Sequence, residues 1–285
     1  MALKGIKPTK VEKRLKALFY GEAGAGKTTA AISFPKVYLI DTEKGATNDQ
    51  YVKLLNDGGG AIFQTTSFDE LVDEVKALLT EKHDYKTLVI DPLTTLYNDL
   101  LDKAEKKVGN EFGRHYGEAN KEMKRLLNLL LRLDMNVIIT CHAKNEYGDN
   151  LKIIGTTFDG YKKLDYLFDL VFCIQKRGQS RVAMVRKSRI ETFEDAEVFP
   201  FSYDEVATRY GREILERDAA IQELASQDQV DQIKHLIELF KVPEETVQKW
   251  LDKASASDLR DLPSDSAQKV IDHLTKQIKR ETNAN

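Results

Sequence analysis

The sequence predicts an α/β fold with a mainly parallel, twisted sheet, followed by a small C-terminal module of helices. From residue 15 to about residue 190, short apolar runs alternate with longer amphipathic stretches, as in parallel strands joined by helical crossovers. After about residue 212, only amphipathic stretches of helical period remain. The predicted parts are a basic N-terminal arm at 1–14, a core at 15–212, and a helical linker with its module at 213–285.

Seven apolar runs have the composition of strands that are buried on both faces, because they are short and rich in Val, Ile, Leu and Phe. The predicted strands cover residues 15–20, 36–41, 61–66, 87–91, 136–141, 170–175 and 181–187.

Amphipathic helices are predicted between and after these strands. Residues 67–82 begin with a capping box of Ser67 and Glu70 and carry one apolar face, and residues 118–134 form a second helix. Helices are also predicted at 228–241, 243–254 and 263–280. Three segments fit neither pattern, and we expect functional or mobile loops there: 45–60, 106–117 and 143–163.

Composition and charge narrow the class of protein. The chain has 285 residues, of which 41% are hydrophobic and 31% charged, and this suits about one and a half to two globular domains. No apolar run approaches the roughly 18 to 20 residues of a membrane helix, and the opening residues resemble no secretion signal. We expect a cytoplasmic protein without a membrane partner, in the host cytoplasm if the chain is viral.

Two basic segments, the N-terminal arm and residues 176–189, stand out against the net charge of −3. Residues 176–189 carry cations without one acid, so a polyanionic partner is compatible with the acidic total. Cys141 and Cys173 lie in apolar segments without a second ligand nearby, and we expect buried thiols instead of a disulfide or zinc site. The basic side chains of the N-terminal arm are Lys4, Lys7, Lys10, Lys13 and Arg14.

The segment GEAGAGKT at residues 21–28 fits the phosphate-binding pattern G-x-x-x-x-G-K-[ST] and lies between an apolar strand and a helix-compatible run. Backbone N–H groups of such a loop surround phosphates, while Lys27 reaches the β and γ phosphates and Thr28 offers a hydroxyl to Mg²⁺. ATP and Mg²⁺ are therefore the predicted cofactors. The predicted phosphate-loop contacts are Gly21, Glu22, Ala23, Gly24, Ala25, Gly26, Lys27, Thr28 and Thr29.

Two acidic positions complete the predicted hydrolytic site. Asp91 ends a buried strand, where a carboxylate can hold magnesium through water, so we assign the metal to Thr28 and Asp91. Residue 92 is proline, which cannot polarise water, and another carboxylate must do so. Glu43, just beyond the strand that follows the phosphate-loop helix, is the candidate general base; a solvated loop acid is the alternative. Asp41 is expected to be structural.

The motifs GEAGAGKT, VYLIDTE, TLVIDP, IITCHAK and VRKSR follow in the order found in RecA-like ATPases. Over residues 15 to about 212 the chain resembles the compact RecA-core ATPases of phages that are related to single-strand annealing proteins and recombinases. The resemblance implies that Glu43 activates water, that His142 senses the γ-phosphate where RecA carries Gln, and that Lys187 and Arg189 contact a neighbouring subunit's ATP. A satisfied strand-end histidine and a solvated basic edge are the alternatives. Tyr51 is a candidate adenine contact or else an ordinary core or surface tyrosine.

The resemblance also implies that two loops face single-stranded DNA. Cations and aromatic faces in 106–117 and 143–163 suit binding of that kind, although acids are interspersed and solvated loops remain the alternative. The candidate DNA-binding residues are Lys106, Lys107, Arg114, Tyr116, Lys144, Lys152, Lys162 and Lys163.

We therefore expect an ATP-hydrolysing homo-oligomer, either a ring or a filament, that acts on single-stranded DNA in phage recombination by annealing or pairing strands. Annealing is the more economical expectation, because the chain lacks the additional DNA-binding domain of full-length recombinases. The alternative is a nucleotide-switched loader or regulatory ATPase whose C-terminal helices bind a single-strand-binding or replication protein. A helicase or packaging motor is disfavoured, because no second motor, primase or nuclease domain is evident.

Overall fold

The protein contains one nine-stranded sheet in the order β3-β2-β4-β5-β1-β7-β8-β9, with β6 paired to β5. This is a computed structural model, and it describes residue 7 and residues 12–282. Strands β1 to β5 and β7 are parallel, whereas β6, β8 and β9 each run antiparallel to the strand they pair with. The strands are β1 (Lys16–Gly21), β2 (Val37–Asp41), β3 (Ala61–Gln64), β4 (Thr87–Asp91), β5 (Asn136–Tyr147), β6 (Ile153–Asp159), β7 (Leu170–Arg177), β8 (Ser180–Ser188) and β9 (Val198–Pro200).

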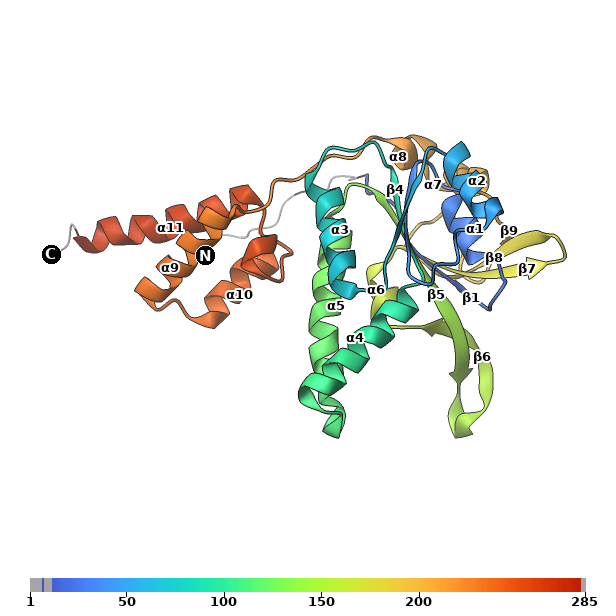
Figure 1. Ribbon diagram of the computed structural model, residues 1–285, viewed down its shortest axis with the longest axis horizontal. Coiled ribbons are helices and arrows are strands. Elements are labelled where there is room, and N and C mark those ends of the chain that lie inside the picture. The colour runs from blue at the N-terminus through green and yellow to red at the C-terminus, as the bar shows by residue number, and fades with distance from the viewer. Residues whose placement is uncertain (1–6, 8–11, 283–285) are drawn as a thin grey trace.

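Helices cover both faces of this sheet, with α3, α4 and α5 on one side and α1, α2 and α7 on the other (Figure 1). Every residue of β1 is buried: Leu18 and Tyr20 face the first layer, while Ala17 and Phe19 face the second. The helices are α1 (Lys27–Ile32), α2 (Asp49–Asp57), α3 (Phe68–Thr80), α4 (Leu93–Val108), α5 (Arg114–Arg132), α6 (Leu164–Leu167), α7 (Tyr203–Tyr210), α8 (Arg212–Glu216), α9 (Gln227–Phe240), α10 (Glu244–Lys253) and α11 (Ser264–Thr282).

The predicted α/β fold class is confirmed: the chain has a core with a mainly parallel sheet covered by helices, followed by C-terminal helices. All seven predicted strands are present, with ends shifted by a few residues. None of the helices in the described residues is long and apolar enough to cross a membrane.

The three segments for which the sequence predicts loops contain regular structure. Residues 45–60 include α2, and 143–163 form a hairpin of β5 and β6 joined by a short turn. In 106–117, α4 ends and α5 begins, with only residues 109–113 between them, which include the one-turn 3-10 helix Glu111–Gly113. In 143–163 the sequence pattern did not reveal β6, because this strand has no buried residue and its side chains need not alternate between apolar and polar.

Much of the predicted basic arm lies outside the described residues, including Lys4 and Lys10. Arg14 is described, and it does not belong to a solvated arm. Its buried guanidinium donates to the backbone carbonyls of Arg217 at 2.7 Å and Lys86 at 3.0 Å. Arg14 therefore ties the start of the core to the end of α8.

The linker is helical only as far as Glu216, so the prediction of a helical linker is wrong for residues 217–226. Other parts of the chain satisfy its backbone: the Gln222 amide donates to Leu79 and the Ala225 amide to Leu262, both at 2.8 Å. Helices α9, α10 and α11 then enclose an apolar cluster of their own. The boundaries of the parts of the chain stay predictions.

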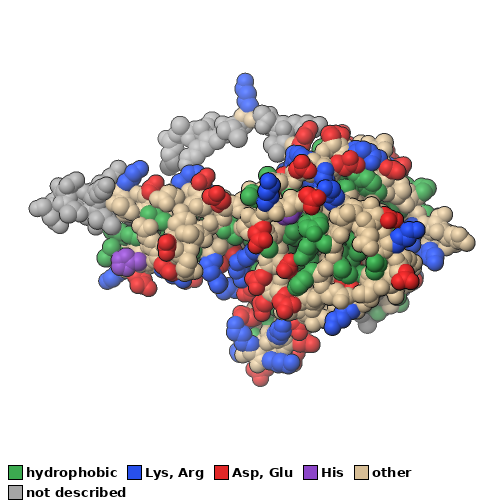
Figure 2. Space-filling model, turned by 45° about the horizontal axis from the view of Figure 1, so that its top comes forward, with side chains coloured by type: hydrophobic (Ala, Val, Ile, Leu, Met, Phe, Trp, Pro, Cys, Tyr) green, Lys and Arg blue, Asp and Glu red, His purple; other side chains and the backbone are tan. Residues whose placement is uncertain are grey.

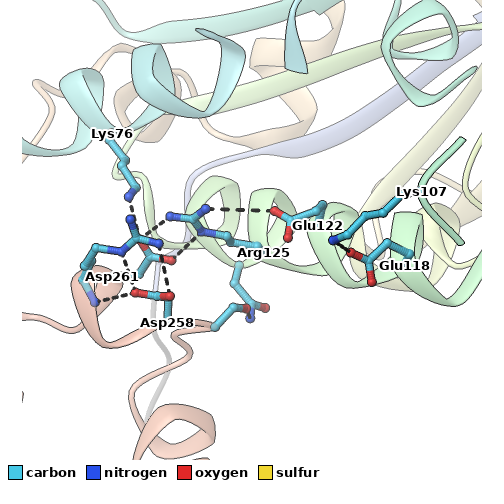
Figure 3. Close-up of polar contacts among 10 residues, drawn as sticks. Lys76, Lys107, Glu118, Glu122, Arg125, Asp258 and Asp261 are labelled. Carbon is cyan, nitrogen blue, oxygen red and sulfur yellow. Dashed lines mark hydrogen bonds and ion pairs between the residues drawn. The ribbon is translucent and has the colours of Figure 1, made fainter. Parts of the chain in front are cut away.

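A buried carboxylate attaches this C-terminal module to α3 and α5 (Figure 3). The side chain of Asp261 is 1% exposed and pairs with Arg125 at 2.8 Å and Lys76 at 2.7 Å. Arg132 donates to the backbone carbonyl of Asp261, and Asn128 donates to Ser257 at 3.0 Å. These contacts define the side of the core on which the module lies.

Candidate nucleotide-binding site

The phosphate loop joins the end of β1 to the first turn of α1. Gly24 and Gly26 have φ values of 76° and 91°, which favour glycine, and a Cβ on Gly21 would lie 2.4 Å from the Ile174 carbonyl oxygen. Lys27 Nζ donates to the carbonyls of Gly21 and Glu22, both at 3.0 Å, so it lies across the loop. Burial lowers the pKa of Lys27, whereas the Asp91 and Glu43 carboxylates raise it.

Asp91 lies at the carboxyl end of β4 and is 8% exposed. One carboxylate oxygen accepts from Thr28 Oγ1 at 2.6 Å, and the other accepts from the Thr140 hydroxyl. Burial raises the pKa of Asp91, and the hydrogen bonds from Thr140 and Thr28 act against this shift. A buried carboxylate joined to a hydroxyl beside a phosphate loop is a donor set that fits Mg²⁺, which prefers oxygen ligands and keeps several waters.

Asp41 organises the loop that carries Glu43. Its carboxylate accepts from the backbone amides of Glu43, Gly45 and Ala46 at 3.0 to 3.3 Å, and from Gln64 Nε2 at 3.1 Å. With four donors and 2% exposure, Asp41 is occupied in holding the backbone. The structural role that we predicted for it agrees with these contacts.

Glu43 and His142 meet at the mouth of the cleft. Glu43 Oε1 accepts from Thr95 Oγ1 at 2.9 Å and lies 3.2 Å from His142 Nε2. Both side chains are nearly half exposed, at 46% and 45%. The His142 amide donates to Thr94 Oγ1 at 3.0 Å, and Thr94 in turn donates to the Asp159 carbonyl at 2.7 Å. A water held beside Glu43 would therefore be accessible from the cleft.

These groups line a cleft of about 280 Å³ beside the phosphate loop. Two segments, 41–48 and 91–92, form its walls. The cleft thus brings together predicted site residues that are up to 119 positions apart in the sequence. Its predicted residues are Ala23, Gly24, Lys27, Thr28, Glu43, Tyr51, Asp91 and His142.

Lys187 and Arg189 do not line this cleft. Because β8 runs antiparallel to β7, its end pairs with the start of β7 at the edge of the sheet opposite the phosphate loop. Lys187 donates to the carbonyls of Asp165 and Phe168, and Arg189, with a side chain 51% exposed, lies 3.7 Å from Asp169. Contact with a neighbouring subunit's ATP stays a prediction for both residues.

Three residues near the phosphate loop were not predicted. Thr95 and Thr140 hold Glu43 and Asp91 through their hydroxyls, and Arg181 lies against Gly26. Thr140 lies near the end of the buried part of β5, and Thr95 lies in the first turn of the helix that follows Asp91, so polar residues at these places were a usable signal. Arg181 gave no such signal, because its position depends on the direction of β8.

Six of the eight candidate DNA-binding residues lie on two projections from the carboxyl edge of the sheet (Figure 1). We call residues 106–117 the helical prong and residues 143–159 the strand prong. All eight candidates are exposed, and Lys162 and Lys163 follow the strand prong. Two candidates have acidic partners: Lys107 pairs with Glu118 and Lys144 with Asp159. Figure 2 shows cations interspersed with acids over the projecting end of the molecule.

Comparisons with known proteins place these observations in a family. The family described as an AAA domain matches residues 13–194. No curated protein matches the chain. Two solved structures are similar. The crystal structure of the RadB recombinase is 20% identical, covers 65% of this chain and 86% of its own, and has a TM-score of 0.46.

The assembled ATPase EscN of the type III secretion system of enteropathogenic E. coli is 13% identical. The likeness covers 92% of this chain and 66% of EscN, with a TM-score of 0.39. At these identities we draw no functional conclusion from either structure.

Proposed function

The chain belongs to the AAA-domain family of P-loop ATPases, and from this premise we propose that it hydrolyses ATP as an oligomer on single-stranded DNA. In this proposal the protein promotes annealing or pairing of strands in phage recombination. The observation that carries the DNA part is the pair of exposed prongs, each of which is connected to the nucleotide cleft by a single element, α4 or β5.

The residues of the cleft suit ATP hydrolysis. Loop N–H groups and Lys27 would hold the β and γ phosphates, and Mg²⁺, bound near Thr28 and Asp91, would neutralise phosphate charge. Glu43 would accept a proton from the attacking water, since its carboxylate faces the cleft and is held by Thr95 and His142. The family supplies the ATPase class, and the roles of these residues are our proposal.

Both prongs connect directly to this chemistry. Helix α4 begins two residues after Asp91 and leads to the helical prong, while β5 continues past His142 into the strand prong. Thr94, in the first turn of α4, bonds to the backbones of both His142 and Asp159, and thus joins α4 to both strands at the base of the strand prong. A change at the γ-phosphate would reach both prongs through these few contacts.

The tips of the prongs suit single-stranded DNA. Phe112 is 99% exposed, and Tyr116 and Tyr147 are 51% and 57% exposed. Exposed aromatic rings beside Lys106, Arg114 and other cations provide stacking faces for bases and positive charge for phosphates.

Steady-state ATPase activity, measured with and without single-stranded DNA, tests the proposal. Anisotropy of a labelled oligonucleotide, with and without ATP and Mg²⁺, is measured in parallel. We expect DNA to stimulate hydrolysis and nucleotide to strengthen DNA binding, and Lys27→Ala to lose both effects. Turnover that ignores DNA, together with no oligonucleotide binding at low salt, would contradict the DNA part and leave the ATPase assignment standing.

A nucleotide-switched loader is the second candidate, and the surface of the C-terminal module favours it. A cleft of about 290 Å³ lies between α10 and α11 and combines apolar Trp250 and Val270 with Lys253, Lys269 and His273. This mixture suits an acidic, partly apolar segment of a replication protein. If the protein is a loader, charge reversal by Lys269→Glu should abolish the loader function without changing ATPase activity. If the recombination proposal holds, the same variant should keep its DNA-dependent activity.

A further inference from the structure

Arg181 occupies a position beside the phosphate loop that its place in the sequence does not reveal. It lies near the start of β8, where it pairs with Lys176 of β7, and its carbonyl accepts from the Phe201 amide at 2.9 Å. The two neighbouring strands thus hold its backbone at the carboxyl edge of the sheet. From there its side chain reaches α1.

The guanidinium of Arg181 lies directly on the phosphate loop. A Cβ built on Gly26 would come within 2.1 Å of Arg181 Nε and 2.8 Å of its Cδ. Arg181 Nη2 donates to Thr29 Oγ1 at 3.3 Å, so the side chain spans Gly26 and the first turn of α1. Glycine at position 26 is therefore needed for this approach as well as for the turn.

This cation lacks the partners that most arginines in the core have. Arg181 Nε is buried without a hydrogen-bond acceptor, and no ion pair joins Arg181 to an acid in the described part of the chain. By contrast, Arg125 and Arg209 each pair with two carboxylates. An arginine that is partly desolvated and lacks an anion, beside a loop built for anions, has unused donors in a fixed fork.

We propose that Arg181 binds the phosphate chain of the nucleotide in the same subunit. This inference rests on the proposed ATP site and adds a residue that neither motif nor family identifies. Lys27 serves the β and γ phosphates and Thr28 the Mg²⁺, whereas the loop backbone surrounds the α and β phosphates, so Arg181, which lies against Gly26 and Thr29, approaches from the α-phosphate side. A charge-assisted, bidentate contact there would hold ATP and ADP alike.

The test is equilibrium binding of fluorescent ADP to the full chain and to Arg181→Ala and Arg181→Gln. The glutamine variant retains most of the stem over Gly26, so it keeps the test valid if the alanine variant folds poorly. We expect Kd to rise about tenfold, the usual loss for a hydrogen bond to a charged group. Arg177→Ala is the matched control, an exposed arginine on the same hairpin, and its Kd should stay within about twofold of the parent's.

Competition by inorganic pyrophosphate identifies the part of the nucleotide that Arg181 contacts. If Arg181 contacts phosphate, its substitution should raise the Kd for pyrophosphate and the Kd for ADP by similar factors. Loss of ADP affinity alone would assign Arg181 to the base or ribose and overturn the proposal. If both Arg181 variants bind ADP like the parent while Lys27→Ala loses binding, the Arg181 proposal is overturned and the proposed ATP site stands. If the parent itself does not bind ADP, both the Arg181 proposal and the proposed ATP site are refuted.

Discussion

Glu43 depends on a neighbouring carboxylate for its place in the cleft. Asp41 accepts three backbone amides of residues 43–46, and this fixes the path of the loop directly after β2. Thr95 and His142 then hold the Glu43 side chain at the cleft mouth. Two acids two positions apart therefore have different tasks: the buried one shapes the backbone, and the half-exposed one is available for proton transfer.

Replacing Glu43 with glutamine tests its role as general base. Because the amide keeps the shape of the side chain but cannot accept a proton, we expect hydrolysis to fall at least about 100-fold while ADP affinity stays near the parental value. Steady-state phosphate release and nucleotide binding measure the two effects. Asp49→Asn, an exposed acid in the first turn of α2, is the control, and hydrolysis at the parental rate in Glu43→Gln would refute the assignment.

At the residue scale, the sequence predicted which residues meet in one cleft wherever a motif fixes the local geometry. Lys27, Thr28, Glu43, Asp91 and His142 meet in one cleft because each lies at the carboxyl end of a parallel strand or just beyond it. Arg181 was missed because strand direction is not visible in an apolar run. The antiparallel course of β8 brings its first residues, and not its last, to the phosphate loop.

Among the elements, the two prongs show where sequence patterns stop being informative. The central strands are buried on both faces, so their apolar runs stand out against the amphipathic helices. Strand β6 of the strand prong has no buried residue and is partly or fully exposed along its length, so its sequence carries no pattern of burial. Because sequence-based prediction of strands relies on a pattern of buried apolar residues, the strands of this exposed hairpin could not be predicted.

The exposed ring of Phe112 tests the helical prong. We expect Phe112→Ala to weaken binding of single-stranded DNA by about tenfold or more, since stacking contributes about 1–3 kcal/mol per base. DNA-independent hydrolysis should persist, because Phe112 lies at the tip of the prong. Leu239→Ala, which removes another exposed apolar side chain from α9, provides the control. Equal DNA affinity of Phe112→Ala and the parent would show that the Phe112 ring is not part of the DNA-binding surface.

The contact between the C-terminal module and the core depends on the charge of Asp261. Burial alone would raise the pKa of Asp261, but hydrogen bonds from Arg125 and Lys76 hold it below its ordinary value of 3.8. A lowered pKa in the folded state means that the stabilisation is complete above about pH 4 and is lost as the pH falls through the folded value. The attachment should therefore be intact at neutral pH and weaken in acid.

Substitution of Asp261 by asparagine should lower the free energy of unfolding by about 3 kcal/mol, because it leaves two partly buried cations without their partner. Hydrogen exchange should become faster in α9 and α11, and the remaining stability should depend less on pH between about 3 and 5. Asp272→Asn, at an exposed position on α11, is the control. An unchanged pH profile would show that Asp261 does not determine the acid sensitivity of the module.

At the scale of the whole molecule, the nucleotide cleft and Arg189 lie at opposite edges of the sheet. A head-to-tail assembly joins two different surfaces, so one subunit's Arg189 can face the next subunit's cleft only in an arrangement of that kind. Lys187 is less suited, because its ammonium already donates to two backbone carbonyls. Hydrolysis would then depend on protein concentration, since a single subunit lacks the second cation.

Mixing two inactive variants tests this arrangement. Arg189→Ala keeps its own Glu43, and Glu43→Gln keeps its own Arg189, so a mixed interface can contain one intact site. We expect each variant alone to hydrolyse ATP at least about tenfold more slowly than the parent, and an equimolar mixture to recover up to about a quarter of parental activity, the share of intact interfaces under random mixing. Full activity of Arg189→Ala alone would exclude the contact in trans. Two inactive variants without recovery would indicate that Arg189 acts within its own chain, through the carbonyls and Asp169 that it contacts in the structure.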